Sequence, residues 1–187
     1  MRAPEWIETE RLVLRRPREE DVEAIFSRYA SDKDVTRFLA WSRHESLYAT
    51  HTFLAFSDTE WARWPAGPYL VESREDCRLL GSTGLAFETA HRAATGYVFA
   101  KDAWGKGFAT ETLLAIIEIG RGVGLSRLYT LCHVENRPSW RVLEKCGFSR
   151  EGVLRRHCEF PNLRPKEPCD VFCYALVFRR AVVRATS

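Results

Sequence analysis

The spacing of hydrophobic and polar positions changes several times in the first hundred residues, and each change predicts a new element. An apolar run at 11–16 predicts a strand, and Pro17 then opens a segment with helical periodicity. The apolar positions of that helix are Val22, Ile25, Phe26 and Tyr29. Residues 46–56 predict a second helix with a looser period. Further apolar runs joined by short polar turns predict antiparallel strands over 68–73, 79–88 and 95–100.

The second half of the chain alternates between helix and strand patterns. A one-sided apolar stripe predicts a helix that begins near Thr110 and ends at Gly122 and Gly124. The stripe consists of Leu113, Ile116, Ile117 and Gly120. Residues 127–134 are apolar on both faces, which is typical of a central strand.

A fourth helix is predicted after Asn136, which is a suitable N-cap residue, and Pro138 is tolerated in a first turn. Its shared face comprises Ser139, Val142, Leu143 and Cys146, and Gly147 ends it. Residues 151–160 and 170–180 predict two closing strands. Since there is no repeat, linker or low-complexity tract, we expect one continuous α/β domain over 1–187, with about seven strands and four helices.

Composition places the chain in the ordinary globular class. Its 187 residues suffice for one buried core, and 45% hydrophobic with 28% charged content is far from that of disordered chains. No apolar run approaches membrane-spanning length, and the first residues lack the apolar core of a signal peptide. A cytoplasmic location without membrane contact is therefore expected.

The six cysteines form no CxxC pair and no zinc-ligand spacing. Reduced thiols that fill space are the favoured interpretation, and no metal site is expected.

Charge is uneven along the chain, although the net value is only +3. Residues 150–187 hold eight Arg and Lys against four acids, a local surplus of four. A basic final fifth can meet an anionic partner, but a solvated face is the commoner explanation. Binding to nucleic acid is the weakest hypothesis, and strongly salt-dependent binding to duplex would be needed to support it.

The segment KDAWGKGFATET, residues 101–112, places Gly105 and Gly107 between a strand that ends at Phe99 and the helix that begins near Thr110. Such a turn lets backbone N–H groups approach an anion, and the helix dipole favours negative charge there. A nucleotide P-loop is excluded because Lys106 is followed by glycine, and the Rossmann fingerprint lacks its third glycine. Taken alone, the turn fits an anion cradle and a plain surface loop equally well.

Several segments together resemble the GNAT acetyltransferase superfamily, in particular the branch that contains the ribosomal-protein N-terminal acetyltransferases. They are, in order, IETERLVLRR near the start, GYVFAKDAWGKGFATET, NRPSWRVLEKCGF and EGVLRRH…DVFCYAL. The likeness covers nearly the whole chain. It implies a mixed, mostly antiparallel seven-stranded sheet that splays between its two central strands, with acetyl-CoA lying between them.

The resemblance also implies a set of cofactor-binding residues. The family's pyrophosphate turn, (Q/R)xxGx(G/A), matches residues 104–109 and departs from the pattern at Trp104. Because the other contacts run through backbone N–H groups, this departure does not threaten phosphate binding. The implied residues are Phe99 and Ala100, whose backbone would pair with the pantetheine arm, Trp104, Gly105, Lys106, Gly107, Phe108, Ala109 and Thr110 at the turn, and Asn136 on the far side. For Lys106 a solvated loop lysine is favoured over a phosphate contact, Asn136 is also a plain N-cap, and Trp104 is a packing anchor.

Acetyl transfer needs a neutral amine, stabilisation of an oxyanion and a proton for the departing thiolate. The resemblance assigns the proton to Ser139, three residues after Asn136, and the role of base to Glu159, with a spacing that differs by about a residue. Ser139 can instead satisfy backbone N–H groups, and Glu159 can pair with nearby arginines. Glu88 and His133 are reserve bases. Tyr174 could supply a hydroxyl, but a core tyrosine is favoured.

The leading hypothesis is transfer of an acetyl group from acetyl-CoA to a primary amine, either a protein N-terminus or a small amine such as an amino acid, polyamine or aminoglycoside. The basic final fifth favours a peptide or an acidic acceptor. A non-catalytic acyl-CoA sensor is the alternative from another class. Folds of this family often pair through sheet edges, so a homodimer is a further expectation.

Overall fold

The computed structural model describes residues 1–178, and the end of the last predicted strand, with Arg179, Arg180 and Arg184, lies outside this range. The described residues form one eight-stranded sheet in the order β1-β2-β3-β4-β5-β6-β8-β7. Every neighbouring pair is antiparallel except β5 and β6. The strands are β1 (Trp6–Glu8), β2 (Leu12–Arg15), β3 (Pro68–Ser73), β4 (Leu79–Thr89), β5 (Arg92–Phe99), β6 (Arg127–His133), β7 (Ser149–Phe160) and β8 (Arg164–Val177).

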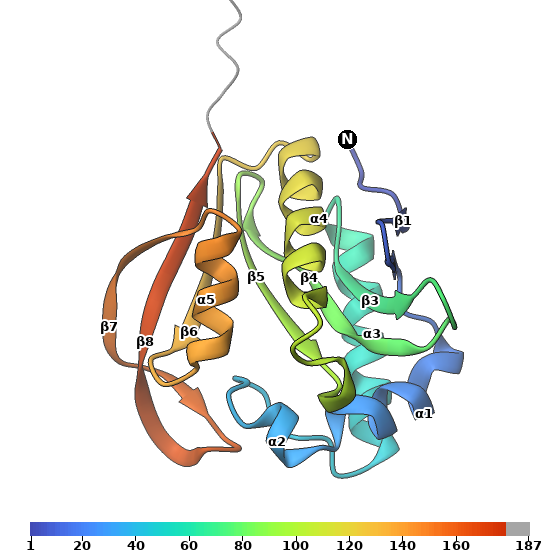
Figure 1. The fold of residues 1–187 in the computed structure, drawn as a ribbon, viewed down its shortest axis with the longest axis horizontal. Helices are drawn as coiled ribbons and strands as arrows, with labels where there is room; N and C mark the ends of the chain where they lie inside the picture. The colour runs from blue at the N-terminus through green and yellow to red at the C-terminus, as the bar shows by residue number, and fades with distance from the viewer. Residues whose placement is uncertain (179–187) are drawn as a thin grey trace, which may run out of the picture.

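Helices cover both faces of this sheet (Figure 1). The cluster of buried side chains that includes Leu113 and Ile116 of α4 lies on one face, and the cluster with Ile25 of α1 and Leu54 of α3 lies on the other. The helices are α1 (Val22–Ile25), continued by a π-turn over Phe26–Ala30, α2 (Lys33–Thr36), α3 (Leu47–Arg63), α4 (Phe108–Gly122) and α5 (Arg137–Lys145).

Helix α4 begins and ends at glycines in the left-handed region. Gly107 is its N-cap with φ +82°, and Gly124, just past its C-terminus, has φ +85°. The predicted stripe of Leu113, Ile116 and Ile117 is buried against the sheet. The helix begins at Phe108, slightly earlier than predicted, because the turn at Gly107 already directs the chain into helical geometry.

The fold confirms the predicted GNAT-like α/β class, with differences in the count of elements. An eighth strand, β1, is only three residues long and too short to show a period in the sequence. The predicted helix after Pro17 is divided between α1 and the π-turn, and the additional α2 is a single turn capped by the Asp32 carboxylate. Helix α3 extends to Arg63, so Trp61 belongs to it and is buried beneath it.

The central strands β5 and β6 pair only at their N-terminal ends. The register joins Arg92–Ala94 of β5 to Arg127–Tyr129 of β6, and the strands diverge beyond it. This is the splay that the family resemblance implies. It leaves the C-terminal half of β5 without a hydrogen-bonding partner on its β6 side.

Candidate active site

A cavity of about 740 Å³ is lined by residues from both faces of the sheet at the splay. Tyr97, Leu113 and Leu143 belong to the core on the α4 face and line one part of it. Phe53 of α3 and Val98 belong to the core on the opposite face and line another part. The cavity therefore passes through the sheet, so two ligands can approach one point from opposite faces.

Strand β5 directs two peptide groups into this opening. The Ala100 N–H donates to Leu80 in β4 at 2.7 Å. Hydrogen bonding alternates along an antiparallel pair, so the peptide groups of Tyr97 and Phe99 face away from β4, toward the splay. Both peptide groups of Ala100 are engaged, because its carbonyl accepts from Ala103 at 2.9 Å. The groups free to pair with an extended ligand are thus both peptide groups of Tyr97 and the N–H of Phe99, so Tyr97 takes the place of Ala100 in the predicted pair.

The glycine turn before α4 leaves room for an anion. Gly105 has φ +74°, and a Cβ added there would meet nothing within 4 Å. A Cβ on Gly107 would meet only Nη2 of Arg11, at 3.4 Å. The first N–H groups of a helix have no intrahelical acceptor, so Phe108 and Ala109 present theirs at this open space. These residues fit a pyrophosphate bound through the backbone.

Arg11, which sequence reasoning missed, holds this turn from the start of β2. Its guanidinium donates to the Lys106 carbonyl at 3.0 Å and to the Glu111 carboxylate at 2.8 Å, and it stacks over the Phe108 ring. Burial alone would raise the pKa of Glu111, but hydrogen bonds from Thr9 and Arg11 outweigh it and lower the pKa. The Lys106 side chain is exposed, as expected of a loop lysine.

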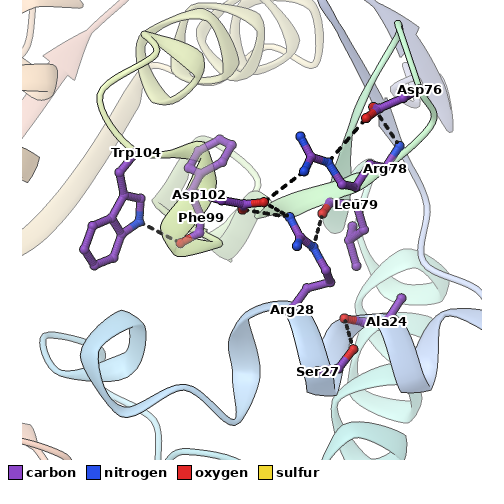
Figure 2. A network of polar contacts seen from close by, with 9 residues as sticks. All are labelled: Ala24, Ser27, Arg28, Asp76, Arg78, Leu79, Phe99, Asp102 and Trp104. Carbon is purple, nitrogen blue, oxygen red and sulfur yellow. Dashed lines mark hydrogen bonds and ion pairs between the residues drawn. The ribbon is translucent and has the colours of Figure 1, made fainter.

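A second network fixes the short turn between β5 and α4 (Figure 2). Asp102 accepts from Arg28 at 2.8 Å and from Arg78 at 2.9 Å, and Arg28 also donates to the Leu79 carbonyl. The hydrogen bond from Arg28 lowers the pKa of Asp102. Lys101 pairs with Asp34 of α2. The chain between strand and turn is thereby tied to several neighbouring elements.

Trp104 anchors the turn through its indole. Nε1 donates to the Phe99 carbonyl at 2.8 Å, as Figure 2 shows, while the side chain stays 48% exposed. This bond gives the residue at the first motif position a role in holding the turn to the end of β5. It occupies the Phe99 carbonyl and leaves that residue's N–H directed toward the splay.

Helix α5 supplies the other wall of the opening. Asn136 is the N-cap residue, but its side chain makes no capping bond, so its amide is available at the cavity. Ser139 lines the cavity, with its Oγ 3.1 Å from the Tyr97 hydroxyl. Burial raises the pKa of Tyr97 far above its usual range, so this hydroxyl stays protonated. The Tyr97–Ser139 contact bridges β5 and α5 across the splay.

Cys132 also lines the cavity, and burial raises its pKa to about 11. Its thiol is therefore protonated at neutral pH and is a poor nucleophile. All six cysteines are free thiols. In residues 1–178 no group of His, Cys, Asp and Glu is arranged to hold a metal ion, and no helix there is long and apolar enough to cross a membrane.

His133 lies in the cavity wall between the rings of Phe38 and Phe160, with ring centroids 5.1 and 4.9 Å away. Burial lowers its pKa, which favours the neutral imidazole. Its Nδ1 accepts the Glu135 N–H at 3.2 Å, so in the neutral ring the proton is on Nε2. The one basic lone pair of the neutral ring is then engaged by the Glu135 N–H and does not point to an incoming amine.

The remaining candidate bases do not reach the cavity. Glu159 is exposed and is not part of the lining, although Cys158 and Phe160 on either side of it are. Side chains alternate along a strand, so the carboxylate projects from the opposite face. Glu88 is itself outside the lining, and it pairs with Arg92 and with the hydroxyl of Tyr129, which does line the cavity. Tyr174 is a buried core residue, as favoured, whose hydroxyl donates to Glu144 at 2.9 Å.

The residues missed by sequence reasoning are Arg11, Tyr97 and the aromatic side chains on the α3 face. Tyr97 belongs to GYVFA, which was used as a strand and family signal but not as a source of a hydroxyl. Its neighbour Phe99 lies on the same face, so alternation alone indicates a core position for both. Only the splay exposes Tyr97 to the opening.

A sheet split at its centre, with an anion turn on one side and a hydroxyl pair at the gap, defines an enzyme that brings a phosphate-bearing cosubstrate to an acceptor. Residues 11–149 match the family model described as the acetyltransferase (GNAT) domain. The uncharacterized N-acetyltransferase YoaA of Bacillus subtilis is 35% identical over 179 residues, which are 91% of this chain and 96% of YoaA. The chain therefore belongs to the GNAT acetyltransferase family, and it is an acetyl-CoA-dependent N-acetyltransferase.

Solved structures agree with this assignment. A GNAT-family acetyltransferase from Bacillus anthracis is 28% identical with a TM-score of 0.80, over 92% of this chain and 98% of that one. RimL, a ribosomal L7/L12 α-N-protein acetyltransferase in complex with coenzyme A, is 22% identical with a TM-score of 0.81, over 92% and 98%. A spermidine N-acetyltransferase from Vibrio cholerae with CoA and spermine is 19% identical with a TM-score of 0.76, over 90% and 96%. The expected likeness to ribosomal-protein acetyltransferases is confirmed, but the fold is shared by enzymes with different acceptors.

Proposed function

We propose that the cavity at the splay is where acetyl-CoA and a primary amine meet, and that transfer occurs by direct attack of the amine on the thioester. The observation that carries this proposal is a single cavity lined from both faces of the sheet, with Ser139 and Tyr97 at the gap. The backbone at 105–109 holds the pyrophosphate, with Trp104 and Arg11 fixing the turn. The N–H of Thr110, which was also predicted to bind, donates to the Gly107 carbonyl at 3.1 Å instead. The peptide groups of Tyr97, the N–H of Phe99 and the amide of Asn136 hold the pantetheine arm.

The chemistry uses few groups of the protein. The amine nitrogen bonds to the thioester carbonyl carbon, the carbon–sulfur bond breaks, and the sulfur takes a proton from the Ser139 hydroxyl. The amine loses a proton to water, water returns a proton to the Ser139 oxygen, and the products are an amide and the free thiol of CoA. Tyr97 is a positioning residue, because its hydroxyl fixes Ser139 Oγ. Water is assigned the role of base, because the structure leaves Glu159 outside the cavity and the Nδ1 lone pair of His133 engaged.

Replacing Ser139 with Ala tests the assignment. We expect kcat to fall by about 10- to 100-fold, since general acid catalysis is lost, while the Kd for acetyl-CoA by calorimetry stays within about twofold. Tyr97→Phe should lower kcat by a smaller factor without raising the KM for acetyl-CoA. The exposed Ser149→Ala is the matched control. An unchanged kcat in Ser139→Ala under chemistry-limited conditions would remove Ser139 from the mechanism, and binding of acetyl-CoA without turnover on any amine would favour the sensor hypothesis.

Three expectations stay predictions: the identity of the acceptor amine, the formation of a homodimer and the cytoplasmic location. The basic residues of the final fifth do not support an acidic acceptor, because among those that the structure describes, 150–178, no Arg or Lys lines the cavity. The arginines and the lysine on β7 and β8 are exposed instead.

A further inference from the structure

The part of the cavity on the α3 face, called the chamber below, differs from the rest because its walls consist mostly of aromatic rings. Phe53 and Phe56 line it from α3, and Phe38 and Trp41 line it from the loop that precedes α3. Phe160 and Tyr129 complete the lining from β7 and β6. Phe56 is 51% exposed although it faces this cavity, as expected where a wall awaits a ligand.

Charge is nearly absent from the chamber. Glu60 of α3 is the one charged side chain in the whole lining, which among the described residues contains no Lys, Arg or Asp. A polyamine or aminoglycoside carries several ammonium groups, and each loses hydration that only carboxylates or similar groups can replace. A single carboxylate cannot serve them, so the lining favours an acceptor with an apolar body.

The floor of the chamber has unfilled space above Gly96. This residue lies within β5 opposite Gly84 of β4, and it lines the cavity. Its φ is not positive, and a Cβ added there would meet nothing within 4 Å. Neither backbone conformation nor packing requires glycine here, and in a strand that lines a cavity a glycine fits a close approach of a ligand to the backbone.

We infer that the acceptor is a primary amine on an apolar, ring-sized body, which lies on the Gly96 floor between the aromatic walls while its amine points to the splay. This inference deepens the proposed function and rests on it. Free aromatic amines and the first residue of a peptide share this chemistry. The cavity volume of about 740 Å³ is within the range of pockets that enclose small ligands.

A panel of amines tests the inference with the full-length enzyme. The probes are 2-phenylethylamine, phenylalanine amide, a tetrapeptide with N-terminal Phe, the same peptide with N-terminal Ser, ethylamine and spermidine. We expect kcat/KM for the best aromatic probe to exceed that for spermidine and ethylamine by about tenfold or more. The free and peptide probes tell the two sources apart. A preference for spermidine, or equal rates for phenylethylamine and ethylamine, would overturn the inference.

Two variants locate the site. Gly96→Val places a side chain into the open floor, and we expect kcat/KM for the aromatic probes to fall about tenfold with little loss for ethylamine. Gly152→Val is the matched control, because Gly152 is also a strand glycine with nothing within 4 Å of an added Cβ. Phe56→Ala should also lower kcat/KM for the aromatic probes. Tyr48→Ala on the same helix should not, because Tyr48 is 80% exposed and outside the lining.

The design separates the two proposals. If acetyl-CoA binds but no amine is acetylated, the proposed function fails. If amines are acetylated but Gly96→Val leaves the aromatic preference unchanged in a folded protein, only the further inference fails. Melting temperature and the Kd for acetyl-CoA are measured for each variant, and both are expected to match the unmodified enzyme.

Discussion

The two halves of the proposed site are built in different ways. The cofactor half consists mostly of backbone groups from one continuous segment, 97–109, held by ion pairs and by Arg11, with the Asn136 amide on its far side; of that segment only Tyr97 and Val98 line the cavity. The acceptor half consists of side chains from β4, β5, β6, β7, α3 and the loop before α3. Backbone groups recognise a feature common to every acetyl-CoA, whereas side chains can change without disturbing the fold. Specificity for the acceptor is thus free to vary on a constant cofactor site.

The largest effect is expected from a side chain placed in the cofactor half, which should affect cofactor binding and not the choice of acceptor. Gly107→Val would fill the phosphate position and force valine into the left-handed region. We expect the affinity for acetyl-CoA to fall by more than about 100-fold, measured by calorimetry.

Gly124→Val controls for backbone strain in that experiment. Gly124 has φ +85° near the other end of the same helix, and an added Cβ would meet nothing within 4 Å. It should destabilise the fold to a similar extent while leaving the affinity intact. Equal losses of affinity in both variants would show that strain, and not occupation of the phosphate position, is responsible.

A smaller effect is expected from the ion pairs behind the turn. Asp102→Asn removes the charge that holds Arg28 and Arg78. Because partly exposed pairs contribute little, we expect the KM for acetyl-CoA to rise only about two- to fivefold, with no change in the preference among acceptors.

Asp58→Asn is the control for this change, since Asp58 pairs with Arg16 away from the cavity. An altered acceptor preference in Asp102→Asn would show that the two halves are coupled.

The smallest effect concerns pH and the acceptor half. Burial lowers the pKa of His133 below its ordinary value of 6.5, so below that pH the unfolded chain binds more protons than the native one. The free energy of unfolding should therefore be fully present above pH 6.5 and fall as the pH drops, with a limit of about 1.4 kcal/mol per pH unit for one group. Urea unfolding at pH 7.5 and 5.5 measures this, and His133→Gln should show a shallower loss.

The exposed His91→Gln serves as the comparison for His133→Gln. Half-buried His44, whose pKa is also lowered by burial, contributes in the same direction, so part of the loss is expected to persist in His133→Gln. A pH dependence that is identical in His133→Gln and the unmodified protein would assign the effect elsewhere.

How much the sequence predicts differs between these halves for a physical reason. The turn at 104–109 was predicted because glycine, turn and helix start are neighbours in the chain. Glu159 was predicted by its position relative to a motif, but register shifts in β7 on either side of it make such counting unreliable. Phe38 and Trp41 lie in a loop without a period, so nothing local indicates that Phe38 packs on His133 of β6 or that both rings line the same cavity as Phe160 of β7.

Asn162 illustrates the limit of local signals. It lies in the turn between β7 and β8, and its amide donates to the Thr36 and Trp41 carbonyls at 2.9 and 2.8 Å and accepts from the Arg43 N–H at 2.8 Å. A lone asparagine in a hairpin turn predicts only the turn. Here it fastens the loop that carries the aromatic wall, a contact across more than a hundred residues of chain.

Because the cavity is lined from both faces of the sheet, each substrate can have a separate entrance. In the proposed arrangement the amine and acetyl-CoA enter from opposite faces, so neither has to leave before the other arrives, and the buried Cys132 thiol is a poor nucleophile for a covalent acetyl intermediate. A ternary complex with either order of arrival follows from this arrangement. An acceptor side without a ligand would also admit water to the thioester, which can hydrolyse it. An apolar acceptor that fills this side would exclude that water.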